Sequence, residues 1–180
     1  MAKASDFLAS CGVEGATAPR IRVTDMLPRH CGVAAWGVYD SVRNEIELGN
    51  PAICAAEAQQ TGLFGHMAPS LAYLSIVAHE ATHAILFSRG LGADRYLEHE
   101  YIASVVSMQV LPESTREVHL ASMPLANQVA LWELTPFLHL MNPDLFTGRA
   151  WRHFDAQPEN CLFLRALADG LLRLPDFSAF

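Results

Sequence analysis

The sequence predicts an α+β fold, in which short strands come first and helices follow. Residues 21–27 alternate apolar and polar side chains with a period of two, as a half-buried strand does. Residues 33–39 and 45–48 flank a short polar loop, which is typical of a β-hairpin. From Pro69 onwards the period changes, and prolines separate the segments. Strands followed by helices favour an α+β class.

The individual elements follow from these periods and from the residues that interrupt them. Residues 1–20 are rich in Ala, Gly and Ser, and we expect an irregular lead-in there. Gly49-Asn50-Pro51 ends the hairpin, whose strands should form a small antiparallel sheet. Gly90 should end the first long helix, because glycine readily adopts the conformation that closes a helix. The expected helices cover residues 71–89, 96–111, 113–121, 125–141 and 159–173.

The chain of 180 residues is predicted to form a single domain. Residues 21–112 would hold the strands and the first two long helices, and residues 113–180 would form a helical half. The composition is 51% hydrophobic and 17% charged, so a substantial core can be buried and intrinsic disorder is excluded. The formal net charge is −7 and no run of Lys or Arg occurs, so nucleic acids and anionic membranes are poor partners.

One apolar stretch, residues 71–87, is nearly long enough for a membrane span. His79, Glu80 and His83 interrupt its centre, and such side chains are costly in hydrocarbon. We therefore expect this segment to be a buried helix of the domain and not a membrane span.

The four cysteines leave two interpretations open. Cys11, Cys31, Cys54 and Cys161 form no CxxC pair, so a zinc site made of cysteines is not expected. They could form two disulfides in an exported protein, or remain free thiols in the cytosol. Residues 1–10 lack the apolar segment of a signal peptide. A periplasmic or secreted location therefore requires both a removed leader and paired cysteines, and otherwise the protein is expected in the cytoplasm.

The segment from His79 to His83 contains the pattern HExxH. On a helix the two histidines lie one turn apart on one face, so both imidazoles can reach one metal ion. Glu80 lies beside them and can address a water bound to that metal. Zinc lowers the pKa of such a water to about 7, and the glutamate accepts its proton as the water attacks a carbonyl. The motif predicts a Zn²⁺ site with Glu80 as general base.

A catalytic zinc site usually has three protein ligands, so a third must come from elsewhere in the chain. Leu86 and Arg89 stand where the extended HExxHxxGxxH motif needs Gly and His, which excludes that arrangement. The next acidic cluster is Glu98-His99-Glu100, at the start of the second expected helix. If that helix begins by Leu97, Glu98 lies nearer the centre of its apolar face than Glu100 does. Spacing alone therefore leaves all three residues of the cluster open.

The combination of HExxH with a later glutamate at the head of a helix resembles the gluzincin class of zinc metallopeptidases. In that class the third-ligand helix begins with Asn-Glu, and this sequence reads His99-Glu100-Tyr101-Ile102-Ala103-Ser104. The resemblance covers about residues 33–105 and implies that Glu100 is the third ligand. Ser104 occupies the position of an aspartate that orients a zinc-bound histidine in thermolysin-like members, so that role is weaker here or filled from elsewhere. Membership of a group of small bacterial zincin-like proteins is compatible with this resemblance.

The resemblance also implies a zincin-like fold and a further catalytic side chain. The predicted hairpin would pack on the HExxH helix and hold a peptide substrate along its edge strand. A histidine or tyrosine downstream of the ligands would stabilise the oxyanion of the tetrahedral intermediate. We expect His153 in this role, from the aromatic and basic segment 148–154. The other candidates in the downstream region are His119, His139, Arg149 and Arg152.

The sequence thus predicts a zinc-dependent metallopeptidase that acts on a peptide or protein substrate. Its expected site is His79, His83 and Glu100 as zinc ligands, with Glu80 and His153 as catalytic residues. Two other functions remain open: a zinc-binding interaction module without activity, and a zinc hydrolase of a non-peptide amide. The sequence gives no indication of the oligomeric state.

Overall fold

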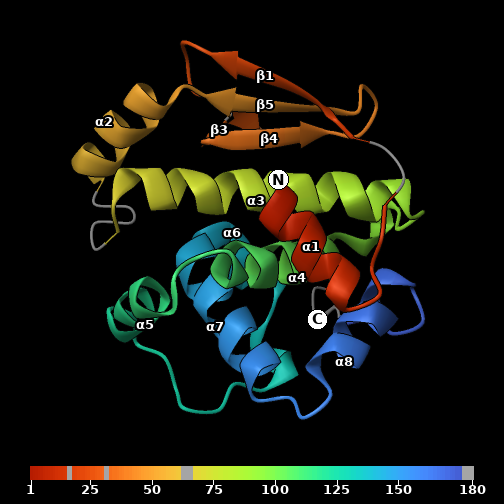
Figure 1. Ribbon diagram of the computed structural model, residues 1–180. Helices are drawn as coiled ribbons and strands as arrows, with labels where there is room; N and C mark the ends of the chain where they lie inside the picture. The colour runs from red at the N-terminus through yellow and green to blue at the C-terminus, as the bar shows by residue number, and fades with distance from the viewer. Residues whose placement is uncertain (16–17, 31–32, 62–66, 176–180) are drawn as a thin grey trace.

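A computed structural model describes residues 1–15, 18–30, 33–61 and 67–175. It confirms the α+β class, with one small three-stranded sheet and a predominantly helical remainder. The sheet lies on one side of the long helix α3 (Pro69–Ser88), and helix α4 (Tyr96–Gln109) packs against the other side of α3 (Figure 1). These two helices form the centre of the molecule, and the later helices pack around α4.

The sheet contains β1 (Arg20–Thr24), β4 (Gly37–Asp40) and β5 (Glu45–Gly49), in the order β1-β5-β4. β4 and β5 form the predicted antiparallel hairpin, while β1 runs parallel to β5. The expectation of a purely antiparallel sheet is therefore wrong. The chain between β1 and β4 reverses through a separate ladder of β2 (Arg29–His30) and β3 (Val33–Ala34), so β5 returns in the direction of β1.

The hairpin turn is built from polar residues that satisfy its backbone. The carboxylate of Asp40 accepts hydrogen bonds from the backbone N–H groups of Val42 and Arg43. Asn44 has a φ of 49°, a left-handed conformation that asparagine tolerates better than most residues. The turn sets the register of β4 on β5 and leaves the other side of β4 as an edge of the sheet.

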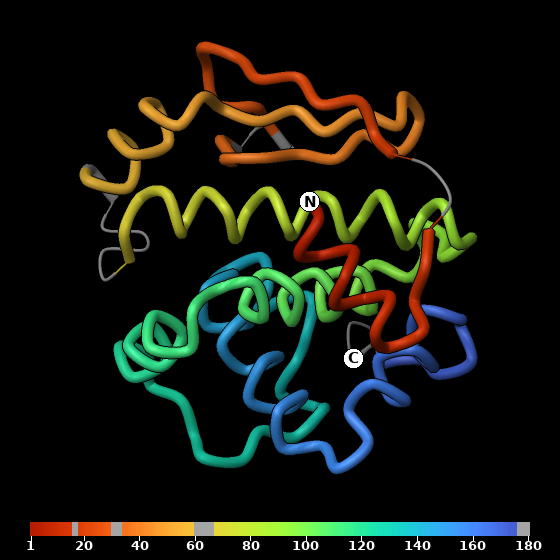
Figure 2. The backbone as a smooth tube through the Cα atoms, viewed as in Figure 1, coloured from red at the N-terminus to blue at the C-terminus, as the bar shows by residue number. Residues whose placement is uncertain are grey.

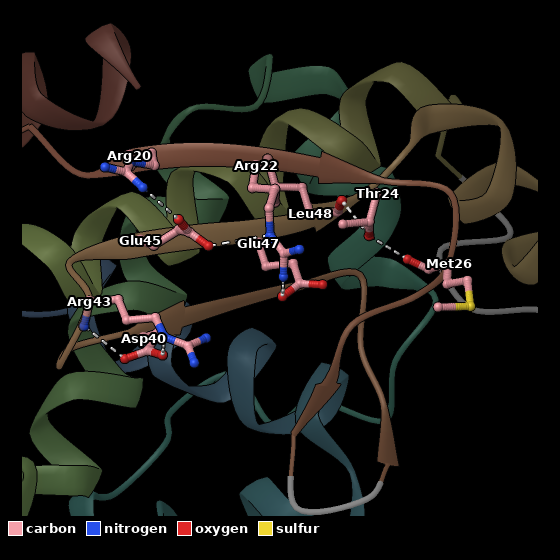
Figure 3. A network of polar contacts seen from close by, with 9 residues as sticks. All are labelled: Arg20, Arg22, Thr24, Met26, Asp40, Arg43, Glu45, Glu47 and Leu48. Atoms are coloured by element: carbon pink, nitrogen blue, oxygen red, sulfur yellow. Dashed lines mark hydrogen bonds and ion pairs between the residues drawn. The ribbon is translucent and has the colours of Figure 1, made fainter.

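The two faces of β5 have opposite character. Ile46 and Leu48 are buried on the side that faces α3, while Glu45 and Glu47 point to the other side. Arg22 of β1 lies 2.6 Å from the carboxylate of Glu47 and 3.3 Å from that of Glu45. Figure 3 shows these residues and their neighbours on the sheet. Such exposed ion pairs add little stability. The alternation places the apolar face of the sheet on the HExxH helix, as the predicted hairpin requires.

The remaining helices are shorter, and prolines begin several of them. α6 and α7 start at Pro136 and Pro143, and the side chains of Thr135 and Asn142 accept hydrogen bonds from their first turns. Proline suits the first turn of a helix because its missing N–H would have no partner there. The helices outside the centre are α2 (Pro51–Thr61), α5 (Glu113–Ala121), α6 (Pro136–Met141), α7 (Pro143–Asp155) and α8 (Asn160–Ala168).

Three sequence-based expectations about helices are wrong. Residues 1–20 are not an irregular lead-in, because α1 (Ala2–Ser10) crosses both central helices and buries Ala4 and Leu8 (Figure 2). The expected helix 125–141 is reduced to a 3₁₀ turn (Leu131–Glu133) and α6, because Pro136 starts a new helix. The segment 148–154 lies within α7, which is not among the expected helices. α2 was not expected either, since Pro51 was interpreted only as the end of the hairpin.

The cysteines match neither interpretation in full. Cys11 and Cys161 form a disulfide that joins the end of α1 to the start of α8. Cys54 is a buried free thiol, and Cys31 lies outside the described residues. In the described part of the chain, no helix has both the length and the apolar character needed to cross a bilayer.

Candidate metal site

The structure brings His79, His83 and Glu100 together between the two central helices. Both histidines project from α3 and the glutamate from α4. The Nε2 atom of His79 lies 3.3 Å from Oε2 of Glu100, and Nε2 of His83 lies 3.6 Å from Oε1. One ligand atom from each of the three residues lies within 4.8 Å of the others. This is the geometry of a group that can hold a metal ion.

His99 determines which nitrogen of His83 faces this group. Nε2 of His99 lies 3.1 Å from the carbonyl oxygen of Leu91, which can only accept, so Nε2 carries the proton. Burial lowers the pKa of His99, so its other nitrogen, Nδ1, is unprotonated and acts as an acceptor. That atom lies 3.4 Å from Nδ1 of His83, which therefore donates to it. The Nε2 atom of His83 is left with a free lone pair directed at Glu100.

The three side chains fit a cation better than they fit one another. With this tautomer, Nε2 of His83 and the carboxylate of Glu100 are two acceptors that face each other without a proton between them. The buried Oε2 of Glu100 accepts no well-aligned hydrogen bond from the described residues, although Nε2 of His79 and Nε2 of His139 lie 3.3 Å and 3.1 Å from it. An unsatisfied buried carboxylate oxygen is costly unless a cation binds it. Two imidazoles and one carboxylate are, moreover, ligands that zinc accepts.

Burial and proximity shift the pKa values of all three groups. Burial lowers the pKa of His83 to about 3, and the neighbouring histidines add to this effect against the charge of Glu100. Burial also lowers the pKa of His79, but the contact with Glu100 outweighs it and the net pKa lies above the ordinary value. Burial raises the pKa of Glu100, while the nearby His83, His139 and His79 hold it well below the usual range. Near neutral pH, Glu100 is therefore anionic and His83 neutral, so both can act as ligands.

Glu80 lies beside the group and is held by the sheet. The backbone N–H of Tyr39 in β4 donates a hydrogen bond to its carboxylate. A Cβ atom on Gly37 would lie 2.8 Å from Cγ of Glu80, so the close approach of β4 to α3 requires glycine at position 37. Burial raises the pKa of Glu80 to about 7, against the lowering effect of His79 and with the added repulsion of Glu100. A carboxylate with this pKa can take and release a proton near neutral pH.

His139 of α6 completes the cluster from the opposite side. Its Nε2 atom lies 3.1 Å from Oε2 of Glu100, and its Nδ1 atom lies 2.5 Å from the hydroxyl of Tyr96. If the tyrosine hydroxyl donates to Nδ1, the proton of His139 is on Nε2 and points into the site. His139 belongs to the downstream histidines that the sequence offered. Tyr96 was missed, although it lies one helical turn before Glu100.

The structure does not bring His153 to this cluster. His153 is buried on α7, where Nδ1 lies 2.8 Å from the hydroxyl of Tyr101 and Nε2 lies 3.2 Å from the side chain of Gln157. These contacts hold His153 between α4 and α8, where its ring packs against the ring of Phe163. The two arginines of the same segment, Arg149 and Arg152, form ion pairs with Glu133 and Glu117.

Glu98, the competing ligand, has a different role. Its Oε1 atom accepts hydrogen bonds from Arg95 and, at 2.7 Å, from the backbone N–H of Leu174. It therefore anchors the segment after α8 and does not face the two histidines. The periodicity that favoured Glu98 fails because every residue of α4 from Leu97 to Met108 is buried, so the helix has no single apolar face. Ser104 bonds to Thr147 of α7 and does not orient a histidine.

The cluster opens into a cavity of about 520 Å³. β4 and the residues before it form one wall, and α3, α4, α6 and the first turn of α7 form the others. Most of the wall is apolar, with Trp36, Ile76 and Met108 among its residues. A cavity of this volume has room for a small ligand or for part of a peptide.

Two chemical elements therefore define the class of site: a group of two histidines and one glutamate that could hold a metal ion, and a buried carboxylate, that of Glu80, beside it. The chain belongs to a family of unknown function, DUF6639, whose model matches residues 1–175. No curated protein and no solved structure matches the chain.

Proposed function

We propose that this protein is a zinc-dependent metallopeptidase of the gluzincin type, with a zincin-like fold. The observation that carries the proposal is the convergence of His79, His83 and Glu100 beside a separately held Glu80. A site that only binds metal needs the first three residues. It does not need a buried carboxylate that is held next to them at a cost in burial energy.

When bound to these ligands, zinc would supply a Lewis acid that polarises a carbonyl and acidifies a water. Glu80 then accepts the proton of the attacking water and passes it to the leaving amine. The hydrogen bond from Tyr39 keeps the Glu80 carboxylate on the side of the cavity wall formed by β4. Because the pKa of Glu80 is about 7, its carboxylate can both accept the proton from the water and release it to the amine at neutral pH.

His139 and Tyr96 can stabilise the negative charge that develops on the carbonyl oxygen. With the Tyr96 hydroxyl as donor to Nδ1 of His139, the Nε2 atom of His139 carries the proton and directs it into the site. A fixed donor of this kind needs no reorganisation as charge develops, which is the source of its catalytic effect. The structure thus favours His139 over His153 for the role that the sequence resemblance implied.

The edge strand β4 supports a peptide as substrate. It lines the cavity through Gly37, Val38 and Tyr39, and its outer edge has no neighbouring strand in the described sheet. An extended peptide could pair with this edge and place its carbonyl near Glu80 and the metal ligands. An amide other than a peptide bond would use the same chemistry without this pairing.

The decisive experiment combines zinc content with hydrolysis. Wild type, His83→Ala, Glu80→Gln and, as a control outside the site, His153→Phe would be compared for bound zinc and for cleavage of a mixed peptide library. We expect about one zinc per chain except in His83→Ala, and cleavage only in wild type and the control. Zinc without cleavage in wild type would favour the non-catalytic module, and no zinc after reconstitution would exclude the metalloenzyme.

A further inference from the structure

Asp144 is an acidic side chain of the cavity wall that the proposed mechanism does not use. It lies in the first turn of α7, which lines the same cavity as the metal group. Among the described residues, none donates a hydrogen bond to its carboxylate or forms an ion pair with it. Burial raises its pKa, as expected for a carboxylate removed from water without a cation nearby.

The charges around the cavity are not balanced without a positive ligand. The wall carries three carboxylates, Glu80, Glu100 and Asp144, and among its described residues it carries no Lys or Arg. A bound Zn²⁺ would offset the charges of Glu80 and Glu100. The carboxylate of Asp144 would then remain as an uncompensated negative charge in a mostly apolar cavity.

We infer that Asp144 is a specificity residue that binds a cationic group of the substrate, either a Lys or Arg side chain or a free amino terminus. This inference rests on the proposed function, because it concerns the substrate of the same site. The apolar wall formed by Trp36, Ile76 and Met108 would accommodate the aliphatic part of such a group, while the charged end reaches Asp144. A neutral substrate would leave the carboxylate desolvated and unpaired.

Zinc-chelating peptide hydroxamates provide a test that does not depend on turnover. Four probes would be compared: a short hydroxamate with lysine or with the uncharged norleucine, each with a free or an acetylated amino terminus. Their affinities would be measured on zinc-loaded wild type, on Asp144→Asn, and on Asp155→Asn as a control from the exposed end of the same helix. The comparison of lysine with norleucine tests a cationic side chain. The comparison of the free with the acetylated amino terminus tests a terminal amine.

We expect one of the cationic probes to bind wild type and Asp155→Asn roughly 10- to 100-fold more tightly than its neutral partner, the range for a charge-assisted hydrogen bond. Asp144→Asn should lose this preference and keep its affinity for the doubly neutral probe, which shows that fold and zinc site are intact. Equal affinity of all four probes for wild type would overturn the inference but not the proposed function. Failure of every hydroxamate to bind the zinc-loaded wild type would overturn both.

Discussion

His99 lies directly behind His83, with their Nδ1 atoms 3.4 Å apart and the far side of the His99 ring against the carbonyl oxygen of Leu91. This relay fixes the tautomer of His83 and directs its free lone pair at Glu100. In a metal site, a hydrogen-bond acceptor behind a ligating histidine fixes the tautomer and the orientation of that ligand. His99 would therefore fill the orienting role if His83 binds a metal ion, since Ser104 bonds to Thr147 instead.

His99→Phe should weaken zinc binding by about 10- to 100-fold, because His83 loses the acceptor that fixes its tautomer. His99→Gln should recover part of the loss, since its amide oxygen can accept the same hydrogen bond. Competition with a chelating dye measures these affinities, and His153→Phe is a matched control for the loss of a buried histidine. An unchanged affinity in His99→Phe would show that the relay does not orient His83.

Tyr96→Phe and His139→Gln should each lower kcat by about 100- to 1000-fold if the pair stabilises the oxyanion. Neither change should alter the zinc content, because the Nε2 atom of His139 is expected to carry a proton and cannot then be a ligand. Steady-state kinetics on a peptide substrate, together with metal analysis, checks both points. Loss of zinc from His139→Gln would instead make His139 a ligand and reverse the assigned tautomer.

Zinc affinity should increase with pH through the raised pKa of His79. Zinc must displace the proton from His79, whereas His83 is already neutral because its pKa is lowered to about 3. Below the pKa of His79 the affinity should therefore rise about tenfold per pH unit, and above it the curve should flatten. Titrations between about pH 5.5 and pH 8 measure this slope, and an affinity independent of pH would contradict the assignment of His79 as a protonated ligand in the free protein.

The disulfide between Cys11 and Cys161 should contribute substantially to stability, because it links positions 150 residues apart. A cross-link over so long a loop restricts the unfolded chain, and its removal typically costs about 2–5 kcal/mol. Urea unfolding with and without a reductant measures the effect. The double variant Cys11→Ser/Cys161→Ser should unfold, with or without the reductant, at the same lower urea midpoint as the reduced wild type. Equal midpoints for oxidised and reduced wild type would contradict a stabilising role of the disulfide.

The sequence by itself determined the features that depend on local spacing. The order of strands before helices, the hairpin at residues 37–49 and the two long helices could be predicted because their patterns repeat over neighbouring residues. The convergence of His79 and His83 follows from one turn of a helix. The helices α1, α2 and α7 were missed because the prolines and small residues in these segments were interpreted only as signs of interruption.

Only the tertiary structure decided which distant residues reach the site. Glu98 and Glu100 are two positions apart on a helix buried on all sides, so no periodicity could separate them, and the packing of α4 between α3 and the segment after α8 decides between them. His139 and His153 likewise differ in which side of α4 their helices cover. The spacing of residues along one element is a local property that the sequence records, whereas the meeting of several elements around one cavity depends on how all of them pack.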